Sequence, residues 1–130
     1  MGVQLDEGHA IFLGPGEGES VPGEHRDFVV KAEREQFEVI EFSCDPEFGP
    51  VDPHIHPDKF DSFYILEGEL EFTIGDETVR APAGSFVAAP PGIRHGFRNP
   101  GPDRARFLNV HAPSDGFIER VRRDARTEEN

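Results

Sequence analysis

Four residues of the types that bind transition metals stand at close spacings in two separated segments of the chain. They are His54, His56, Asp61 and His95. Three imidazoles and one carboxylate form a donor set used by open sites for first-row metals, and this set does not select sharply among them. The sequence therefore predicts one divalent transition metal per chain, of the group Fe, Mn, Ni, Cu, Co and Zn.

The spacing of these residues predicts how they could meet. His54 and His56 are two positions apart, so on a β-strand both imidazoles would point to the same face. Asp61 follows a predicted turn at Pro57 and Asp58 and could return toward that face from the next strand. His95 lies far along the chain, so it can complete the site only if the strands enclose a common interior.

Short strands are the elements that must position these side chains. Turn residues recur at short intervals, and apolar residues alternate with polar ones, as in Leu70, Phe72 and Ile74. This pattern indicates an all-β antiparallel sandwich or barrel. The predicted strands cover residues 28–30, 37–42, 62–66, 70–74, 79–81, 85–89, 94–98 and 105–111. On the strand after Asp61, Phe63 and Ile65 are expected to point inward with it.

A single domain is predicted over residues 1–130. Its barrel core is expected at about 28–111, after an N-terminal strand and loop in 1–27. The apolar run at 10–13 precedes a Gly-, Glu- and Pro-rich segment at 14–26, which indicates a loop. A short helix is predicted at about 115–126, with Asp115 as its N-cap.

Composition excludes several classes of partner. The formal net charge of −13 argues against nucleic acid and against anionic membrane surfaces, since both require a basic face.

Cys44 is the only cysteine, so an intramolecular disulfide is impossible and a reducing compartment is expected. No signal peptide and no apolar stretch of membrane-spanning length is recognisable, so a cytoplasmic protein is predicted.

The two segments resemble the two motifs of the cupin superfamily, which is a family of small jelly-roll β-barrels. The second family motif, G-x5-P-x-G-x2-H-x3-N, is matched without exception from Gly84 to Asn99. The first, G-x5-H-x-H-x3,4-E-x6-G, is matched from Gly49 to Gly68 with two departures. Gly49 lies one residue closer to the first histidine than usual, and Asp61 stands where the family usually has Glu. The chain resembles short single-domain cupins, including bacterial proteins likened to quercetin dioxygenase.

This resemblance implies a double-stranded β-helix fold with His54, His56 and His95 as metal ligands. Asp61 takes the position of the family's Glu, which can be both ligand and acid or base, so Asp61 is predicted as ligand and catalytic residue. A pocket for a small apolar or aromatic molecule is predicted around the metal. Its predicted lining is Phe48, Phe63, Phe72, Phe97 and His111.

Three functional classes follow from the resemblance. The first is a metal-dependent enzyme, with dioxygenase-like oxidation favoured and cyclisation or isomerisation as alternatives. The second is a metal-containing protein that binds or senses a small molecule without turnover, and the third is a structural cupin whose histidines bind nothing. The strand at 37–42 carries apolar residues toward both faces, so a C2 homodimer is also predicted.

Overall fold

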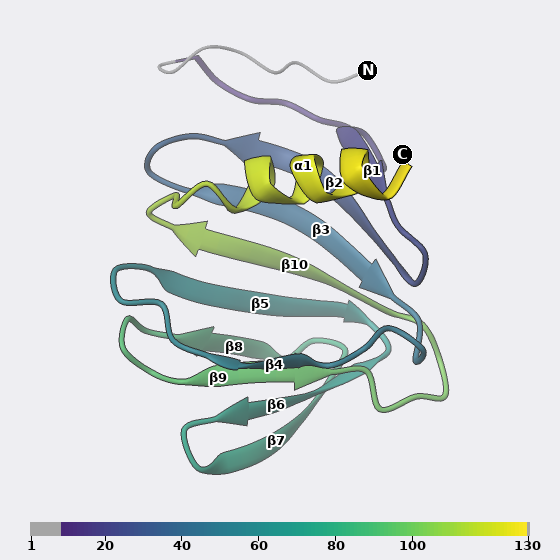
Figure 1. The fold of residues 1–130 in the computed structure, drawn as a ribbon, viewed down its shortest axis with the longest axis vertical. Helices are drawn as coiled ribbons and strands as arrows, with labels where there is room; N and C mark the ends of the chain where they lie inside the picture. Colours follow the sequence, from purple (N-terminus) through teal and green to yellow (C-terminus); the bar gives the residue numbers. More distant parts are fainter. Residues whose placement is uncertain (1–8, 130) are drawn as a thin grey trace.

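The protein consists of two antiparallel β-sheets that face each other, with one helix packed at one end of them (Figure 1). A computed structural model describes residues 9–129. The six-stranded sheet has the order β1-β2-β3-β10-β5-β8. Its strands are β1 (Glu19–Pro22), β2 (Arg26–Glu33), β3 (Glu38–Cys44), β10 (Ala105–Ala112), β5 (Phe60–Glu67) and β8 (Phe86–Ala89). The four-stranded sheet, in the order β4-β9-β6-β7, contains β4 (Val51–His54), β9 (His95–Arg98), β6 (Glu69–Ile74) and β7 (Glu77–Pro82).

The predicted all-β jelly-roll architecture is confirmed. Every strand pair of both sheets is antiparallel, and the two sheets close over a common interior without a strand pairing that joins them among residues 9–129. The fold is therefore a jelly roll of two facing sheets rather than a fully closed barrel.

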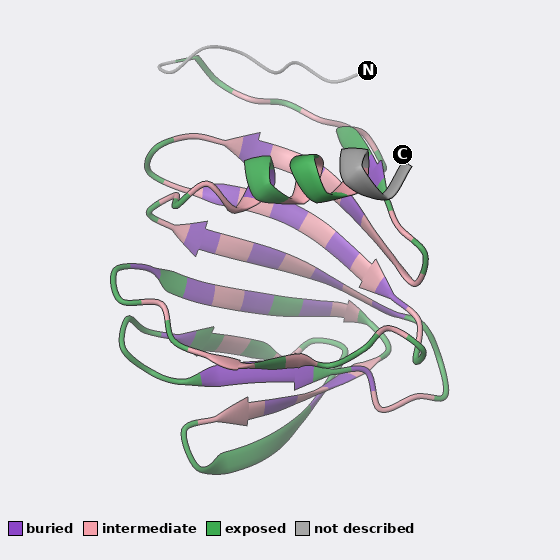
Figure 2. Cartoon of the chain, in the orientation of Figure 1, coloured by how far each residue is buried: buried purple, intermediate pink, exposed green. Residues whose placement is uncertain are grey.

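Alternation along the strands builds the core between the sheets. On β2, β3 and β10 buried residues alternate with half-buried ones, which is visible as alternating colours in Figure 2. Aromatic rings from both sheets meet inside, with Phe42 stacked on Phe107 at 4.6 Å and Phe63 against Phe72 at 4.8 Å between ring centroids. Each such pair adds about 0.5–1.5 kcal/mol beyond the burial of its apolar area. The expected inward direction of Asp61, Phe63 and Ile65 is confirmed, since all three are buried.

The N-terminal part corrects one prediction. The segment 14–26 was expected to be a loop, yet it contains β1 and the first residue of β2. The strand β1 pairs antiparallel with β2, with Glu19 opposite Val30, and buries only Val21. One apolar residue in four gives no alternation that a sequence pattern can detect. The apolar run at 10–13 forms no strand, and Phe12 is largely exposed.

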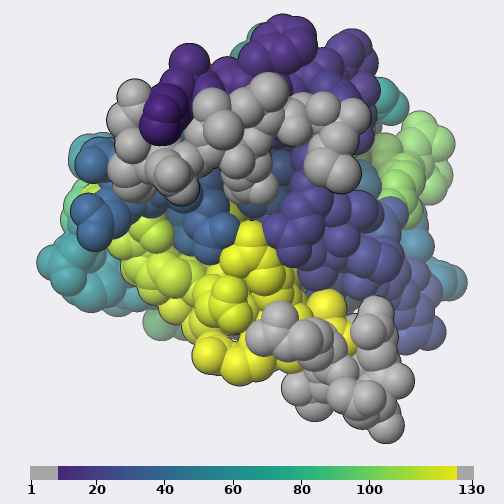
Figure 3. Space-filling view, turned by 90° about the horizontal axis from the view of Figure 1, so that it is seen from above, coloured from purple at the N-terminus to yellow at the C-terminus, as the bar shows by residue number. Residues whose placement is uncertain are grey.

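The predicted C-terminal helix is present as α1 (Phe117–Glu129), which begins two residues later than expected. Seen from above, its described surface lies directly against the early strands (Figure 3), where Ile118 and Phe117 pack on Phe28 and its neighbours. Asp115 does not cap the helix as predicted. The backbone N–H of Ile118 instead donates to the carboxylate of Glu38 on β3. No helix among the described residues is long and apolar enough to cross a membrane.

Candidate metal centre

Two neighbouring strands of the four-stranded sheet bring His54 and His95 together. In the pairing of β4 with β9, Val51 lies opposite Phe97 and His54 opposite His95, with a bulge between them. A bulge turns side chains and increases local twist, and here it directs His54 toward His95. Gly96 allows the close approach, because a Cβ at that position would collide with the backbone oxygen of Val51.

His56, from the loop after β4, and Asp61, from the six-stranded sheet, complete the cluster. His54 and His56 were expected on one strand, but β4 ends at His54 and His56 lies in the loop after it. The Nε2 atoms of the two rings are nevertheless 2.9 Å apart. Asp61 projects from β5 of the six-stranded sheet, and its Oδ2 lies 2.8 Å from His95 Nε2 and 3.5 Å from His56 Nε2. All four donor atoms lie within 4.8 Å of one another, so the centre is built between the two sheets.

These distances fit a single first-row metal ion. Ligand atoms about 2.1 Å from a metal are separated by about 3.0 Å at right angles and by about 3.4 Å in a tetrahedron. The three measured separations are 2.8, 2.9 and 3.5 Å. The residues present therefore fit the metal that the donor set predicts.

Backbone carbonyls orient two of the imidazoles. His54 Nδ1 donates to the carbonyl oxygen of Asp52 at 2.9 Å, and His95 Nδ1 donates to that of Ile93 at 2.9 Å. A ring nitrogen that donates in this way leaves the other nitrogen as the ligand and fixes the ring plane. In both rings, the nitrogen left for the metal is the Nε2 that faces the centre.

The two oxygens of Asp61 have different partners. Oδ1 accepts a hydrogen bond from Asn109 Nδ2 at 2.8 Å and lies 3.2 Å from His111 Nε2. Oδ2 faces the histidine cluster. Burial by itself raises the pKa of Asp61, but hydrogen bonds from His111 and His95 outweigh it and hold the pKa well below its ordinary value. The carboxylate is thus ionised, offers one oxygen to a metal, and is a weak base.

The histidines of the centre differ in their affinity for protons. Burial and the positive charge of Lys59 lower the pKa of His56 to about 4, so its ring is neutral and has a free lone pair at neutral pH. Burial alone lowers the pKa of His95, but the hydrogen bonds with Asp61 and the Ile93 carbonyl raise it above its ordinary value. A proton on His95 and a metal ion would therefore compete for the same negative site beside Asp61.

A cavity of about 80 Å³ lies beside the donor atoms. It is lined by Phe42, Val51, His54, His56, Asp61, Phe63, Phe97, Asn109, His111 and Phe117. Of the predicted pocket residues, Phe63, Phe97 and His111 line the cavity, whereas Phe72 lies in the core and Phe48 packs edge-on against Phe42 outside the cavity lining. The volume is small beside the ~300–1,000 Å³ of pockets that enclose drug-sized ligands. Only a small molecule fits without movement of the walls.

Sequence reasoning missed three residues near the centre: Asn109, Lys59 and Phe117. Asn109 has the inward parity of His111 on β10, which is a signal that could have found it. Lys59 is 2 % exposed, and nothing local in the sequence distinguishes it from a surface lysine. Phe117 belongs to the apolar face that the helix pattern indicates, but that pattern does not indicate that the start of α1 reaches the centre.

Residues 43–111 match the family described as the Cupin domain. The chain belongs to the cupin family. The matched region holds all four donor residues, from His54 to His95, while Phe117 and α1 lie outside it.

Similar proteins include one curated sequence and many solved structures. The chain is 34 % identical over 58 residues to the polyketide synthase CurC of Streptomyces cyaneus, which is 45 % of this chain and only 38 % of that protein. KdgF from Halomonas sp. superposes with a TM-score of 0.74 at 19 % identity, covering 85 % of this chain and 99 % of that one. The polyketide cyclase RemF from Streptomyces resistomycificus gives a TM-score of 0.61 at 24 % identity, covering 76 % and 70 %. At these identities the structures establish the fold alone.

Proposed function

We propose that this protein is a metal-dependent enzyme that acts on a small apolar or aromatic organic molecule with an oxygen atom able to bind the metal. One observation carries the proposal. Three imidazole Nε2 atoms and a single carboxylate oxygen, Asp61 Oδ2, converge beside a cavity with apolar walls. Four protein donors leave positions free on a six-coordinate ion, as catalytic rather than structural sites require.

The residues of the chain would divide the work as follows. His54, His56, His95 and Asp61 would hold the ion. A bound redox-active metal would supply electron transfer with dioxygen, and Zn(II) would supply Lewis acidity. The rings of Phe42, Phe63 and Phe97 would bind the apolar part of the substrate and exclude water, which strengthens electrostatic interactions inside the cavity. Asn109 would keep Asp61 in place through its hydrogen bond to Oδ1.

Oxidation by dioxygen is the reaction class that we propose first. A bound redox-active metal would supply the oxidation chemistry, and the apolar walls formed by Phe42, Phe63 and Phe97 would orient the substrate and exclude water. The depressed pKa of Asp61 argues for a role as an anionic ligand, since a carboxylate that holds protons so weakly is a poor general base. Of the two roles predicted for Asp61, we therefore propose that it acts as a negatively charged metal ligand and not as an acid or base.

Cyclisation or isomerisation of an enolisable substrate is the second candidate. Its support is the sequence relative named as a polyketide synthase, together with the RemF structure, in which this fold serves a polyketide cyclase. The cavity of about 80 Å³ favours a compact substrate over a polycyclic one.

The test begins with metal-free protein reloaded separately with each of the six metals. Oxygen uptake and mass spectrometry of the recovered compounds are then followed on flavonols, diketones and polyketide-like phenols. His95→Ala is the inactivating variant, and His9→Ala is the matched control, since His9 is exposed and belongs to no metal-binding cluster among the described residues. We expect turnover that requires metal and His95 and does not require His9.

Each other outcome identifies a different function. Products formed without oxygen uptake would favour cyclisation or isomerisation. Recovery of every compound unchanged, with thermal stabilisation by one of them, would favour a binding or sensing protein. Failure of wild-type protein to retain any of the metals would leave a structural cupin and refute the proposed enzyme.

A further inference from the structure

Lys59 places a buried ammonium group within reach of the metal centre. The residue is 2 % exposed and lies in the loop between β4 and β5. Its Nζ is 2.9 Å from Asp115 Oδ2 and 3.1 Å from His111 Nδ1. A lysine is almost never buried unless it is paired, and the carboxylate of Asp115 supplies the opposite charge. Lys59 is therefore a charged donor held against one nitrogen of His111.

This contact determines which nitrogen of His111 carries the proton. An ammonium group has three donors and no acceptor, so His111 Nδ1 must accept from Lys59. The ring N–H that faces Asp61 then lies on Nε2, which is 3.2 Å from Asp61 Oδ1. Together with Asn109 Nδ2 at 2.8 Å, this gives Oδ1 two donors. With Oδ1 occupied, Oδ2 is the oxygen that is left for the metal.

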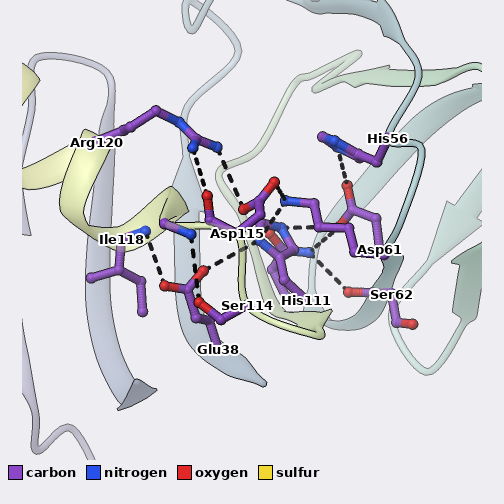
Figure 4. A network of polar contacts seen from close by, with 12 residues as sticks. Glu38, His56, Asp61, Ser62, His111, Ser114, Asp115, Ile118 and Arg120 are labelled. Carbon is purple, nitrogen blue, oxygen red and sulfur yellow. Dashed lines mark hydrogen bonds and ion pairs between the residues drawn. The ribbon is translucent and has the colours of Figure 1, made fainter. Parts of the chain in front are cut away.

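Glu38 is a competitor for the same nitrogen. Figure 4 shows His111 between Asp61 on one side and Glu38 on the other. Glu38 is buried, and its Oε1, which has no hydrogen-bond partner among the described residues, lies 3.9 Å from His111 Nδ1. Without Lys59, this carboxylate would favour a proton on Nδ1. The bare lone pair of Nε2 would then face Asp61 Oδ1, and the two would repel.

We propose that Lys59 is a positioning residue that holds His111 in its Nε2–H form and thereby keeps Asp61 as a single-oxygen ligand of the metal centre. The last step of this inference rests on the proposed metal-dependent function, while the control of His111 by Lys59 does not. The same three charged groups, Glu38, Asp115 and Lys59, also connect this site to the start of α1 through the Ile118 N–H.

Nitrogen NMR of the metal-free full-length protein tests the proton position directly. In protein labelled with 15N-histidine, long-range spectra distinguish a protonated from an unprotonated ring nitrogen, and the His111 signals are assigned by their loss in His111→Gln. We expect an unprotonated Nδ1 and a protonated Nε2 in the wild type. Lys59→Met should move the proton to Nδ1. Lys31→Met is the matched control, since Lys31 is the only other lysine and donates to the Glu17 carbonyl.

Metal affinity supplies the second readout, measured with Zn(II) in competition with a chromophoric chelator. Loss of a group that orients a ligand typically costs about 10- to 100-fold in affinity, and we expect a loss in this range for Lys59→Met. Adding Glu38→Gln to Lys59→Met should restore both the Nε2–H form and most of the affinity. The new amide can donate to His111 Nδ1, although it cannot replace the ion pair with Asp115. A purely structural role of Lys59 would not be rescued in this way.

Two results would overturn the proposal. The first is a wild-type spectrum with the His111 proton on Nδ1, or with both nitrogens protonated, and this result does not depend on whether any variant folds. The second is a folded Lys59→Met protein with an unchanged His111 spectrum and unchanged Zn(II) affinity. Wild-type protein that binds no Zn(II) would instead refute the proposed function, and the spectrum would still decide the role of Lys59.

Discussion

Replacing Asp61 by asparagine should separate its part in metal binding from its part in the fold. The two side chains have the same shape, so Oδ1 can still accept from Asn109, and the new amide can donate to His95 Nε2 in place of the present 2.8 Å contact. The charge is lost, which weakens these two hydrogen bonds by about 1 kcal/mol each. The metal-free variant should therefore fold and melt about 7 °C below the wild type.

The rise in melting temperature that a bound metal gives the wild type can be estimated from the length of the chain. For 130 residues, the entropy of unfolding near the melting temperature is about 0.27 kcal/mol/K. A ligand at 100 times its Kd stabilises the folded state by about 2.7 kcal/mol. The two values together give a rise in melting temperature of about 10 °C.

The variant should lose nearly all of this rise. An amide nitrogen does not replace the carboxylate oxygen as a ligand, and removal of a ligand should weaken binding by at least the ~100-fold upper range seen for orienting residues. At the same metal concentration the variant is then near its own Kd, where stabilisation is about 0.4 kcal/mol and the rise about 1.5 °C.

Differential scanning calorimetry of chelator-treated protein, with and without Zn(II), measures these shifts. Asp76→Asn, at an exposed hairpin turn, is the matched control and should keep the wild-type shift. A full shift in Asp61→Asn would show that Asp61 is not a ligand and that the three histidines suffice. The absence of a shift in the wild type would refute the metal centre itself.

Three further predictions concern the rest of the molecule. Burial raises the pKa of the Cys44 thiol to about 11 from 9.0, so the thiol loses its proton at lower pH in the unfolded chain than in the folded one, and the free energy of unfolding should fall as pH rises from about 9 to 11. Cys44→Ala should abolish that part of the decline, and native protein should resist alkylation by iodoacetamide near pH 8. Phe107→Ala, at a fully buried ring stacked on Phe42, should lower the free energy of unfolding in urea by about 3–5 kcal/mol, and a loss under about 1 kcal/mol would contradict the packing described. The homodimer was predicted to pair through the strand at 37–42, which is β3 of the six-stranded sheet; the outer face of the same sheet also carries Tyr64 and Phe86, which lie opposite each other and are 45 % and 65 % exposed. Light scattering should show a dimer for the wild type and a monomer for Phe86→Lys, and a monomeric wild type would exclude the homodimer.

Strand identity and facing were largely predictable, because both depend on local alternation. Asp61, Phe63 and Ile65 were placed inward by parity alone, and all three are buried. Elements with weak alternation were missed, as β1 was, because one buried residue among polar ones leaves no pattern. The helix start was displaced for a related reason. The helix is capped by the carboxylate of Glu38, which accepts a hydrogen bond from the Ile118 N–H although the two residues are 80 positions apart in sequence.

Pocket residues were predicted less well, because parity specifies a face and does not specify depth. Phe63 and Phe72 both point inward and their rings touch at 4.8 Å. Only Phe63 reaches the cavity, since Phe72 fills the core of the four-stranded sheet. Phe117 enters the cavity wall from a helix outside the matched family region, which no strand pattern could indicate.

The sequence by itself determined the chemistry of the centre. The residue types and spacings of His54, His56, Asp61 and His95 specify the donor atoms, since metal preference belongs to the side chains themselves. Only the tertiary structure decided how those donors are held. The β4–β9 bulge directs His54 to His95, while Lys59 and Asn109 act on Asp61, one through His111 and one directly. These arrangements depend on register and on contacts between distant segments. Strand parity can place Asn109 and His111 on the inner face, but only the folded chain brings them, and Lys59, to the carboxylate of Asp61.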